Sequence, residues 1–262
     1  HMAVRERILV MGSFGSSKSY QWLLLARALK DRQFYCIDTD DAIAFMLENQ
    51  FQDLKNVTVH QVFDFDGYKR AQDECLKEAR EGDFIVVDLI DEAWKAVQRF
   101  YVEQIFEKEK GDYLLEFRRK MREREDKTKG GKKVKSLQAL EGWVDWPVVN
   151  ALYDDFIMPL LFQTPAHLYA AAKVSKIGED NDSADRELYG PFGVKPAGQK
   201  NLGHQFHSVF LFAQDKEHKD AWVMSTIKDR RAQAQYPDGK WFDHQALNSL
   251  YFQYFVRMEI GL

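Results

Sequence analysis

One loop near the start of the sequence has the residue types and spacing that bind phosphate. Residues 12–19 read GSFGSSKS, which matches the pattern G-x-x-x-x-G-K-[ST] except that Ser17 replaces the second glycine. In this pattern the backbone N–H groups and the N-terminus of the following helix bind phosphate oxygens, and Lys18 reaches the β and γ phosphates. The hydroxyl of Ser19 is suited to bind Mg²⁺. The residues predicted to contact ATP are Gly12, Ser13, Phe14, Gly15, Ser16, Ser17, Lys18, Ser19 and Tyr20.

Two features leave alternatives open at this loop. A Ser/Gly turn can simply cap a helix without binding a ligand. Ser17 also restricts a backbone position that glycine would leave free, which lowers affinity or rate without removing the site.

A carboxylate follows a second apolar run. Residues 84–87 read FIVV and are followed by Asp88, the arrangement that places an acid at a strand end beside a phosphate loop, where it can hold a water ligand of Mg²⁺. Any buried strand can end in Asp, so the assignment depends on the loop that precedes it. Asp91 and Glu92 are expected to form the acidic first turn of the next helix.

The elements that must position these residues alternate along the chain. Short apolar runs predict buried strands, and longer segments with helical spacing lie between them. This order predicts an α/β fold with a mostly parallel sheet, whose ligands bind at the carboxyl ends of the strands. Segment 175–205 is expected to be a long functional or disordered loop. The expected strands are 8–11, 34–37, 84–87 and 168–174, with 206–212 and 221–227 as an antiparallel pair, and the expected helices are 19–30, 42–50, 68–81, 91–110 and 147–162.

Composition narrows the class of protein. The 262 residues are 45% hydrophobic and 30% charged, with two cysteines and no apolar run of the roughly 20 residues that span a bilayer. We therefore expect a cytoplasmic protein without a disulfide framework, formed by a single domain over residues 3–262. The first two residues resemble a cloning scar.

Charge is concentrated in one segment. The net charge is −4, yet residues 118–135 contain ten Lys or Arg and three acids, a local charge of +7. We interpret 108–141 as an insertion, part helix and part mobile loop. Its basic residues suit either DNA phosphates or solvent. The candidate DNA contacts here are Arg118, Arg119, Lys132 and Lys133.

Outside this insertion the chain resembles the RecA-like P-loop ATPases, most closely the small RecA-like ATPases of bacteriophages associated with single-strand annealing and recombination. The resemblance implies a catalytic acid at the end of the strand after the phosphate-loop helix. Asp40 falls on that position, with Asp38 as second choice, and either could instead solvate the strand end.

Two later segments carry the resemblance further. The passage from Gly190 to His207 resembles a loop that faces DNA in RecA-like recombinases, which implies Lys195 and Lys200 as backbone contacts unless the loop is merely solvated. Residues 228–230, KDR, are similar to a K-x-R element that some RecA-like ATPases insert into a neighbouring subunit's site. Lys228 and Arg230 are thus candidate catalytic cations, or else a solvated strand end. Neither His204 nor His207 has partners at the spacing of a zinc site.

Three functions remain open on these residues. The favoured one is a Mg²⁺-dependent ATPase that forms a head-to-tail oligomer and binds single-stranded DNA, located in the host cytoplasm if viral. The second is a small-molecule phosphotransferase in which Arg118, Arg119, Arg122 and Arg124 close over the phosphates. The third is a nucleotide-binding scaffold with little hydrolysis.

Overall fold

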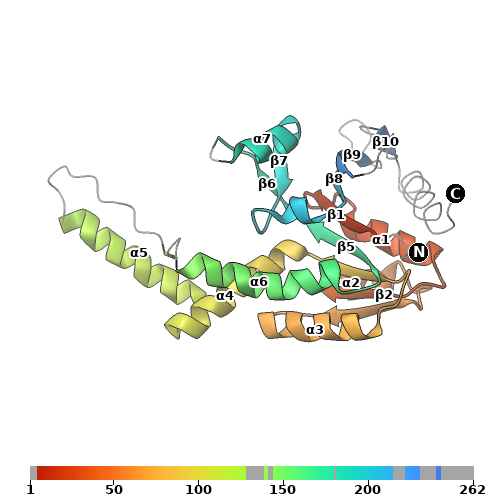
Figure 1. Ribbon diagram of the computed structural model, residues 1–262, viewed down its shortest axis with the longest axis horizontal. Helices are drawn as coiled ribbons and strands as arrows, with labels where there is room; N and C mark the ends of the chain where they lie inside the picture. The colour runs from red at the N-terminus through yellow and green to blue at the C-terminus, as the bar shows by residue number, and fades with distance from the viewer. Residues whose placement is uncertain are drawn as a thin grey trace.

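A twisted eight-stranded sheet forms the centre of the molecule (Figure 1). The computed structural model describes residues 5–127, 139–140, 144–179, 181–214, 222–230 and 240–242. The strand order is β10-β9-β8-β1-β5-β4-β2-β3. The strands are β1 (Arg7–Gly12), β2 (Phe34–Asp38), β3 (Val57–Gln61), β4 (Phe84–Asp88), β5 (His167–Ala172), β8 (Ser208–Gln214), β9 (Trp222–Asp229) and β10 (Lys240–Phe242).

Six neighbouring strands, from β8 across to β3, are parallel, and β9 and β10 add to the β8 edge in antiparallel pairing. The predicted α/β class with a mostly parallel sheet is confirmed, and so is the antiparallel pair, which is β8 with β9. Because the six strands are parallel, their carboxyl ends meet at one edge of the sheet.

Helices cover both faces of this sheet. Alternate residues of β1 divide between two hydrophobic clusters: Leu9 and Met11 pack towards α3, α4 and α6, whereas Ile8 and Val10 pack towards α1 and α2. Burial on both faces explains the continuous apolar runs within β1, β2, β4 and β5. The helices are α1 (Lys18–Ala28), α2 (Ala42–Asn49), α3 (Phe65–Glu78), α4 (Ile90–Phe106), α5 (Lys110–Lys127), α6 (Asp145–Phe162) and α7 (Ser183–Tyr189).

The expectation that 175–205 is a loop without secondary structure is wrong. The segment holds the two-stranded sheet of β6 (Val174–Lys176) and β7 (Val194–Pro196), helix α7, and the 3₁₀ turns η1 (Gly190–Phe192) and η2 (Leu202–Gln205). These elements are too short to show a hydrophobic period. Local contacts define them instead, as where the Asp182 carboxylate accepts the backbone N–H of Asp185 at 2.8 Å and caps α7.

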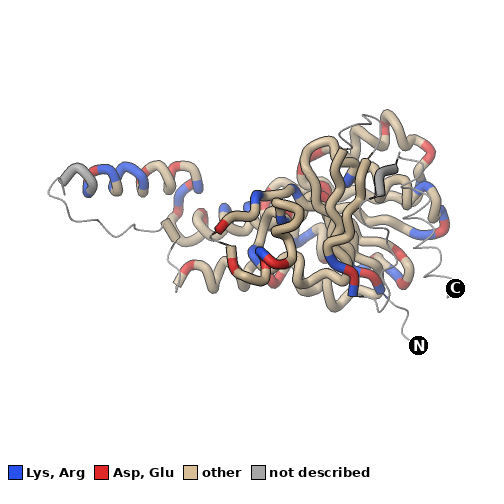
Figure 2. The backbone as a smooth tube through the Cα atoms, turned by 90° about the horizontal axis from the view of Figure 1, so that it is seen from above, with Lys and Arg blue, Asp and Glu red and all other residues tan. Residues whose placement is uncertain are grey.

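Segment 108–141, which we predicted to be an insertion, contains α5, which projects away from the sheet and carries several Lys and Arg residues (Figure 2). The candidates Lys132 and Lys133 lie outside the described residues. Within the part of the chain that the structure describes, no helix has both the length and the apolar character needed to cross a membrane.

Asn56 supports the C-terminal end of α1, the helix that follows the phosphate loop. Its buried side-chain amide donates to the carbonyl oxygens of Ala26, Leu29 and Arg32 at 2.8–3.0 Å. Asn56→Ala leaves these carbonyls without that donor, so we expect a loss of about 1–3 kcal/mol in the free energy of unfolding, measured by urea denaturation. Asn49→Ala, which removes one exposed bond to Phe45, is the matched control, with an expected change within about 0.5 kcal/mol. Equal losses in the two variants would contradict this role.

Candidate nucleotide-binding site

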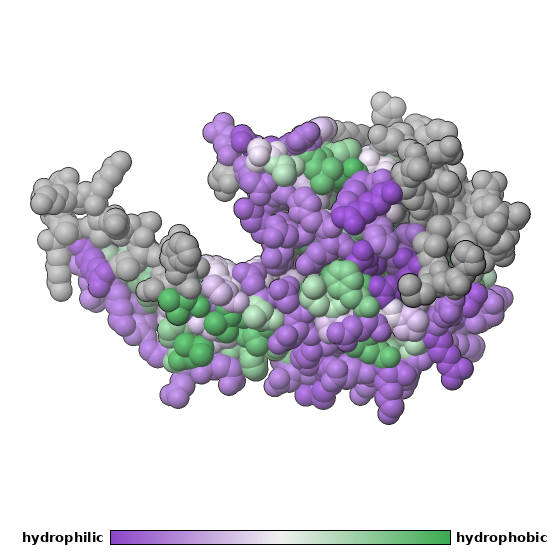
Figure 3. Space-filling view, in the orientation of Figure 1, coloured by the Kyte–Doolittle hydropathy of each residue, from purple (hydrophilic) through white to green (hydrophobic). Residues whose placement is uncertain are grey.

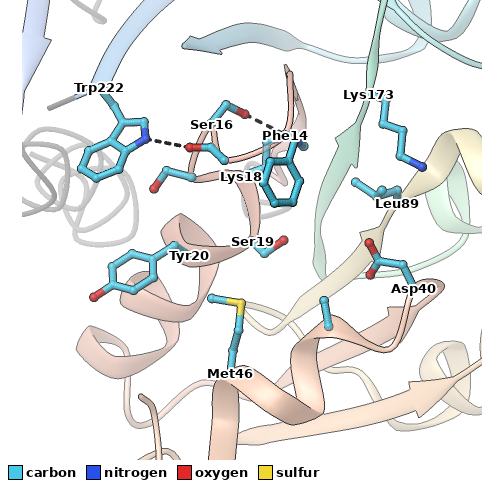
Figure 4. Close-up of a pocket in the computed structure, with 13 residues that line it drawn as sticks. Phe14, Ser16, Lys18, Ser19, Tyr20, Asp40, Met46, Leu89, Lys173 and Trp222 are labelled. Carbon is cyan, nitrogen blue, oxygen red and sulfur yellow. Dashed lines mark hydrogen bonds between the residues drawn. The ribbon is translucent and has the colours of Figure 1, made fainter. Parts of the chain in front are cut away.

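The predicted phosphate loop, residues 12–19, runs from the carboxyl end of β1 into the start of α1, at the edge where the parallel strands end (Figure 4). Gly12 is required by space, because a Cβ there would lie 2.2 Å from the Ser16 hydroxyl and 2.5 Å from the Phe212 carbonyl oxygen. Gly15 has a φ of +71°, the left-handed conformation that favours glycine.

Ser17 adopts the same left-handed conformation, with a φ of 73°, immediately before α1. This is the position where the sequence pattern expects glycine. The conformation costs a residue with a side chain about 1–2 kcal/mol, so the loop holds the glycine-like geometry at an energetic cost. The predicted effect of Ser17 on the loop therefore has a specific physical cause, because serine adopts a positive φ there.

Lys18 lies inside the loop. Its ammonium donates to the carbonyl oxygens of Gly12 at 3.0 Å and Ser13 at 2.9 Å. Burial lowers the pKa of the Lys18 ammonium, and the negative charge of Asp88 acts in the opposite direction. A cation held among carbonyls at the start of a helix can bind phosphate oxygens, which accept the same donors more strongly because they are charged.

Asp88 and Ser19, predicted to share Mg²⁺, lie together. The Asp88 carboxylate ends β4, is 1% exposed, and accepts hydrogen bonds from the Ser19 side chain and from the indole N–H of Trp22 at 3.1 Å. Burial raises the pKa of Asp88, and these two bonds oppose that shift. A hydroxyl and a carboxylate beside a lysine form a donor set that suits Mg²⁺ with phosphate.

The two candidate acids after β2 have different surroundings. Asp38 is fully buried, and its carboxylate accepts the backbone N–H groups of Asp40 at 3.3 Å and Ile43 at 3.2 Å. It therefore organises the turn into α2. Asp40 instead lines the pocket beside the phosphate loop. Of the two, Asp40 is placed to meet a ligand.

The pocket has a volume of about 430 Å³, and Figure 4 shows its labelled side chains arranged around the loop. Sequence reasoning missed Leu89, Met46, Trp222 and Lys173. The indole of Trp222 donates to the Gly15 carbonyl at 3.0 Å, a contact between distant parts of the chain that no local pattern indicates. Lys173 directly follows β5, but the apolar run predicted a strand through residue 174, so the sequence did not place Lys173 at a strand end. The lining residues are Phe14, Gly15, Ser16, Ser17, Lys18, Ser19, Tyr20, Asp40, Ala42, Met46, Leu89, Lys173 and Trp222.

Lys228 and Arg230 lie at the opposite edge of the sheet. Strand register aligns Asp229 with Ser208 and Ile8 at the start of β1, whereas the loop follows its end, roughly 13–16 Å away at about 3.3 Å per residue. The ammonium of Lys228 donates to the carbonyl of Gly203 at 2.9 Å. Burial and the nearby guanidinium groups of Arg230 and Arg7 lower the pKa of Lys228 to about 8. These cations do not meet the phosphate loop of their own chain.

The candidate DNA contacts lie on different elements and differ in their partners. Arg118 and Arg119 are exposed on α5. Lys195 is only 16% exposed and forms a 2.8 Å ion pair with Asp185, so its charge is used within the 175–205 segment. Lys200 is 63% exposed and pairs with Asp182 at 3.1 Å.

Comparison with solved structures identifies the fold as RecA-like. The crystal structure of the RadB recombinase matches with a TM-score of 0.51 and 13% sequence identity, over 92% of this chain and 88% of that chain. At this identity the likeness concerns the fold alone. No protein-family model matches the chain, and no curated sequence does either.

The buried position of Asp38 predicts how the stability of the fold depends on pH. Burial raises the pKa of Asp38 from the usual 3.8 to about 6, so between these values the folded state holds more protons than the unfolded state. Its contribution to stability is therefore present at about pH 4 and is lost as pH rises through about 6, by at most roughly 3 kcal/mol. Asp38→Asn should weaken this dependence in chemical denaturation from pH 4 to 7.

Asp53→Asn is the control for that measurement. Asp53 is an exposed partner of Arg27, and that bond lowers its pKa, so removing it acts in the opposite direction. A stability–pH curve for Asp38→Asn parallel to that of the wild type would contradict the raised pKa.

Proposed function

We propose that this protein is a Mg²⁺-dependent ATPase of the phage recombination type that assembles head to tail and couples nucleotide state to the binding of single-stranded DNA in the cytoplasm. The observation that carries the proposal is the meeting of Lys18, Ser19 and Asp88 at the carboxyl edge of a RecA-like sheet. Phosphate affinity follows from the loop, and the neighbouring pocket has room for the rest of a nucleotide.

Each residue has a distinct role in the proposed site. Lys18 and the N-terminus of α1 bind the phosphates, and Ser19 with Asp88 would hold Mg²⁺. The metal, when bound, neutralises charge on the phosphate oxygens. Asp40 is the proposed base that orients the attacking water, because its carboxylate lines the pocket while that of Asp38 is bound to backbone N–H groups.

DNA binding is a separate part of the proposal and depends on residues outside the nucleotide pocket. It is supported by the basic residues of α5, of which Arg118 and Arg119 are exposed. The phosphotransferase alternative needs the same arginines to close over the pocket, whereas α5 extends away from the sheet at the end remote from α1 (Figure 1). The scaffold alternative retains one supporting observation, the left-handed Ser17.

Phosphate release with and without single-stranded DNA tests this function. We expect Mg²⁺-dependent release that DNA stimulates, and we expect Lys18→Ala to abolish nucleotide binding because that cation lies within the phosphate loop. Nucleotide binding without release would favour the scaffold, and a phosphorylated small molecule would favour the phosphotransferase. Unchanged ATP affinity in Lys18→Ala would contradict the phosphate-loop assignment.

Ser17→Gly is the companion variant in the same assay. Glycine adopts the observed φ without strain, so turnover should be preserved or raised. A large fall in turnover would instead assign a function to the Ser17 hydroxyl, which accepts a hydrogen bond from Gln21 at 3.0 Å.

Another prediction concerns Lys228 and Arg230. We propose that these residues act on the phosphates bound by a neighbouring subunit. Arg230→Ala and Lys18→Ala should each be inactive alone, and mixing them should restore some phosphate release, because their shared interface combines an intact loop with an intact Arg230. Lys18→Ala mixed with the Lys18→Ala, Arg230→Ala double variant is the control and should stay inactive. Mixed oligomers without recovery would rule out action in trans.

A further inference from the structure

One threonine joins the ends of the two strands that carry the proposed catalytic carboxylates. Thr39 directly follows β2 and directly precedes Asp40. Its backbone N–H donates to the carbonyl oxygen of Asp88, the last residue of β4, at 2.9 Å. These two strands are neighbours in the sheet and run parallel. The position of Asp40 relative to Asp88 therefore depends on the chain at Thr39.

The hydroxyl of Thr39 extends this link to the residue after Asp88. Its oxygen accepts the backbone N–H of Leu89 at 2.7 Å, and the hydroxyl donates to the Leu89 carbonyl oxygen at 3.4 Å. Leu89 is 5% exposed and lies beside Asp40 in the lining of the pocket (Figure 4). Because a buried N–H without a partner is unfavourable, the chain at Thr39 or Leu89 would have to move if this hydroxyl were lost.

Tyr68 holds the Thr39 hydroxyl from α3. It belongs to the buried face of this helix, opposite a surface that is mainly hydrophilic (Figure 3). Its phenol shares a hydrogen bond with the Thr39 hydroxyl, and its ring packs edge-on against Phe156 of α6 with centroids 5.5 Å apart. The ring is 2% exposed. The hydrophobic core therefore holds the phenol, and the phenol in turn restricts the side chain of Thr39.

The carboxylate of Asp40 is positioned by its backbone. Among the residues that the structure describes, none forms a hydrogen bond or an ion pair with this carboxylate. The Asp40 N–H donates to the Asp38 carboxylate at 3.3 Å, and the preceding residue is Thr39, held as described above. A group that activates water must lie within hydrogen-bond reach of it, and a misplacement of about 1 Å can lower a rate about a hundred-fold.

We infer that Thr39 and Tyr68 are positioning residues for hydrolysis, which hold Asp40 at the distance from Asp88 that the attacking water requires. The inference rests on the proposed ATPase function. Neither Thr39 nor Tyr68 lines the pocket, so both act through Asp40 and not on the nucleotide itself.

Single-turnover hydrolysis and ATP affinity, measured with Mg²⁺ on the same variants of the full chain, test the inference. Thr39→Val keeps the shape of the side chain and removes the hydroxyl. We expect its hydrolysis rate to fall about ten-fold and its ATP affinity to stay within about two-fold, because the base moves while the phosphate contacts remain. Tyr68→Phe should lower the rate by less, since the bond from Leu89 to Thr39 is kept. Thr39→Ser should restore most of the rate.

Two buried hydroxyls elsewhere provide matched controls. Thr164 is 4% exposed, and its hydroxyl oxygen accepts the N–H of Ala166 at 3.1 Å just before β5, at the opposite edge of the sheet. Thr164→Val removes an equivalent bond, so it should lower the urea midpoint as Thr39→Val does and leave the hydrolysis rate unchanged. Tyr153→Phe removes a buried phenol whose oxygen has no hydrogen-bond partner in the described part of the chain, and its rate should also be unchanged.

The comparison of these variants separates positioning from stability. An unchanged hydrolysis rate in Thr39→Val, or equal losses of rate in Thr39→Val and Thr164→Val, would overturn the inference. So would a loss confined to ATP affinity. If Thr39→Val is too unstable to assay, an unchanged rate in Tyr68→Phe has the same consequence. A wild-type protein that binds ATP and does not hydrolyse it would overturn the proposed ATPase function itself, and this inference with it.

Discussion

The buried contact between the first turns of α1 and the carboxylate of Asp88 is the constraint on which the site depends. A buried carboxylate is costly unless it accepts hydrogen bonds, and here Ser19 and the fully buried Trp22 supply them. Trp22 also stacks near Phe34 of β2, with ring centroids 6.4 Å apart. The contact therefore fixes α1 against β4 and β2, so the phosphate loop, which has no regular structure, is positioned by the hydrophobic core beneath it.

Much of this arrangement could be predicted from sequence because its determinants are local or follow from sheet topology. The apolar runs ending in Gly12 and Asp88 predicted two strands, and parallel order brings their carboxyl ends to one edge. β3 was missed for the opposite reason. It lies at the edge of the sheet, so its sequence, VTVHQ, mixes apolar and polar residues and lacks the continuous apolar run of its buried neighbours.

The rest of the site could not be predicted because it depends on contacts between distant segments. Trp222 reaches the loop only because β9 pairs antiparallel with β8, which returns the chain to that edge. Lys173 is distinguished from its neighbours only by where β5 ends, and the apolar pattern continues one residue beyond it. Similarly, the ion pair of Lys195 with Asp185 engages the charge of a candidate DNA contact, and no local sequence pattern indicates that pairing.

The two ends of strand β9 lie in chemically different surroundings. Trp222 at its start lies by the predicted phosphate loop. At its other end, burial and then the repulsion of Arg230 and Arg7 lower the pKa of Lys228 to about 8. An anion at that edge would relieve the repulsion. The proposed head-to-tail assembly would bring the predicted phosphate site of one subunit to the cations of the next, the arrangement that builds rings or filaments. In the proposed assembly Lys228 and Arg230 would approach the nucleotide from the next subunit, so hydrolysis would depend on a phosphate contacted from two sides.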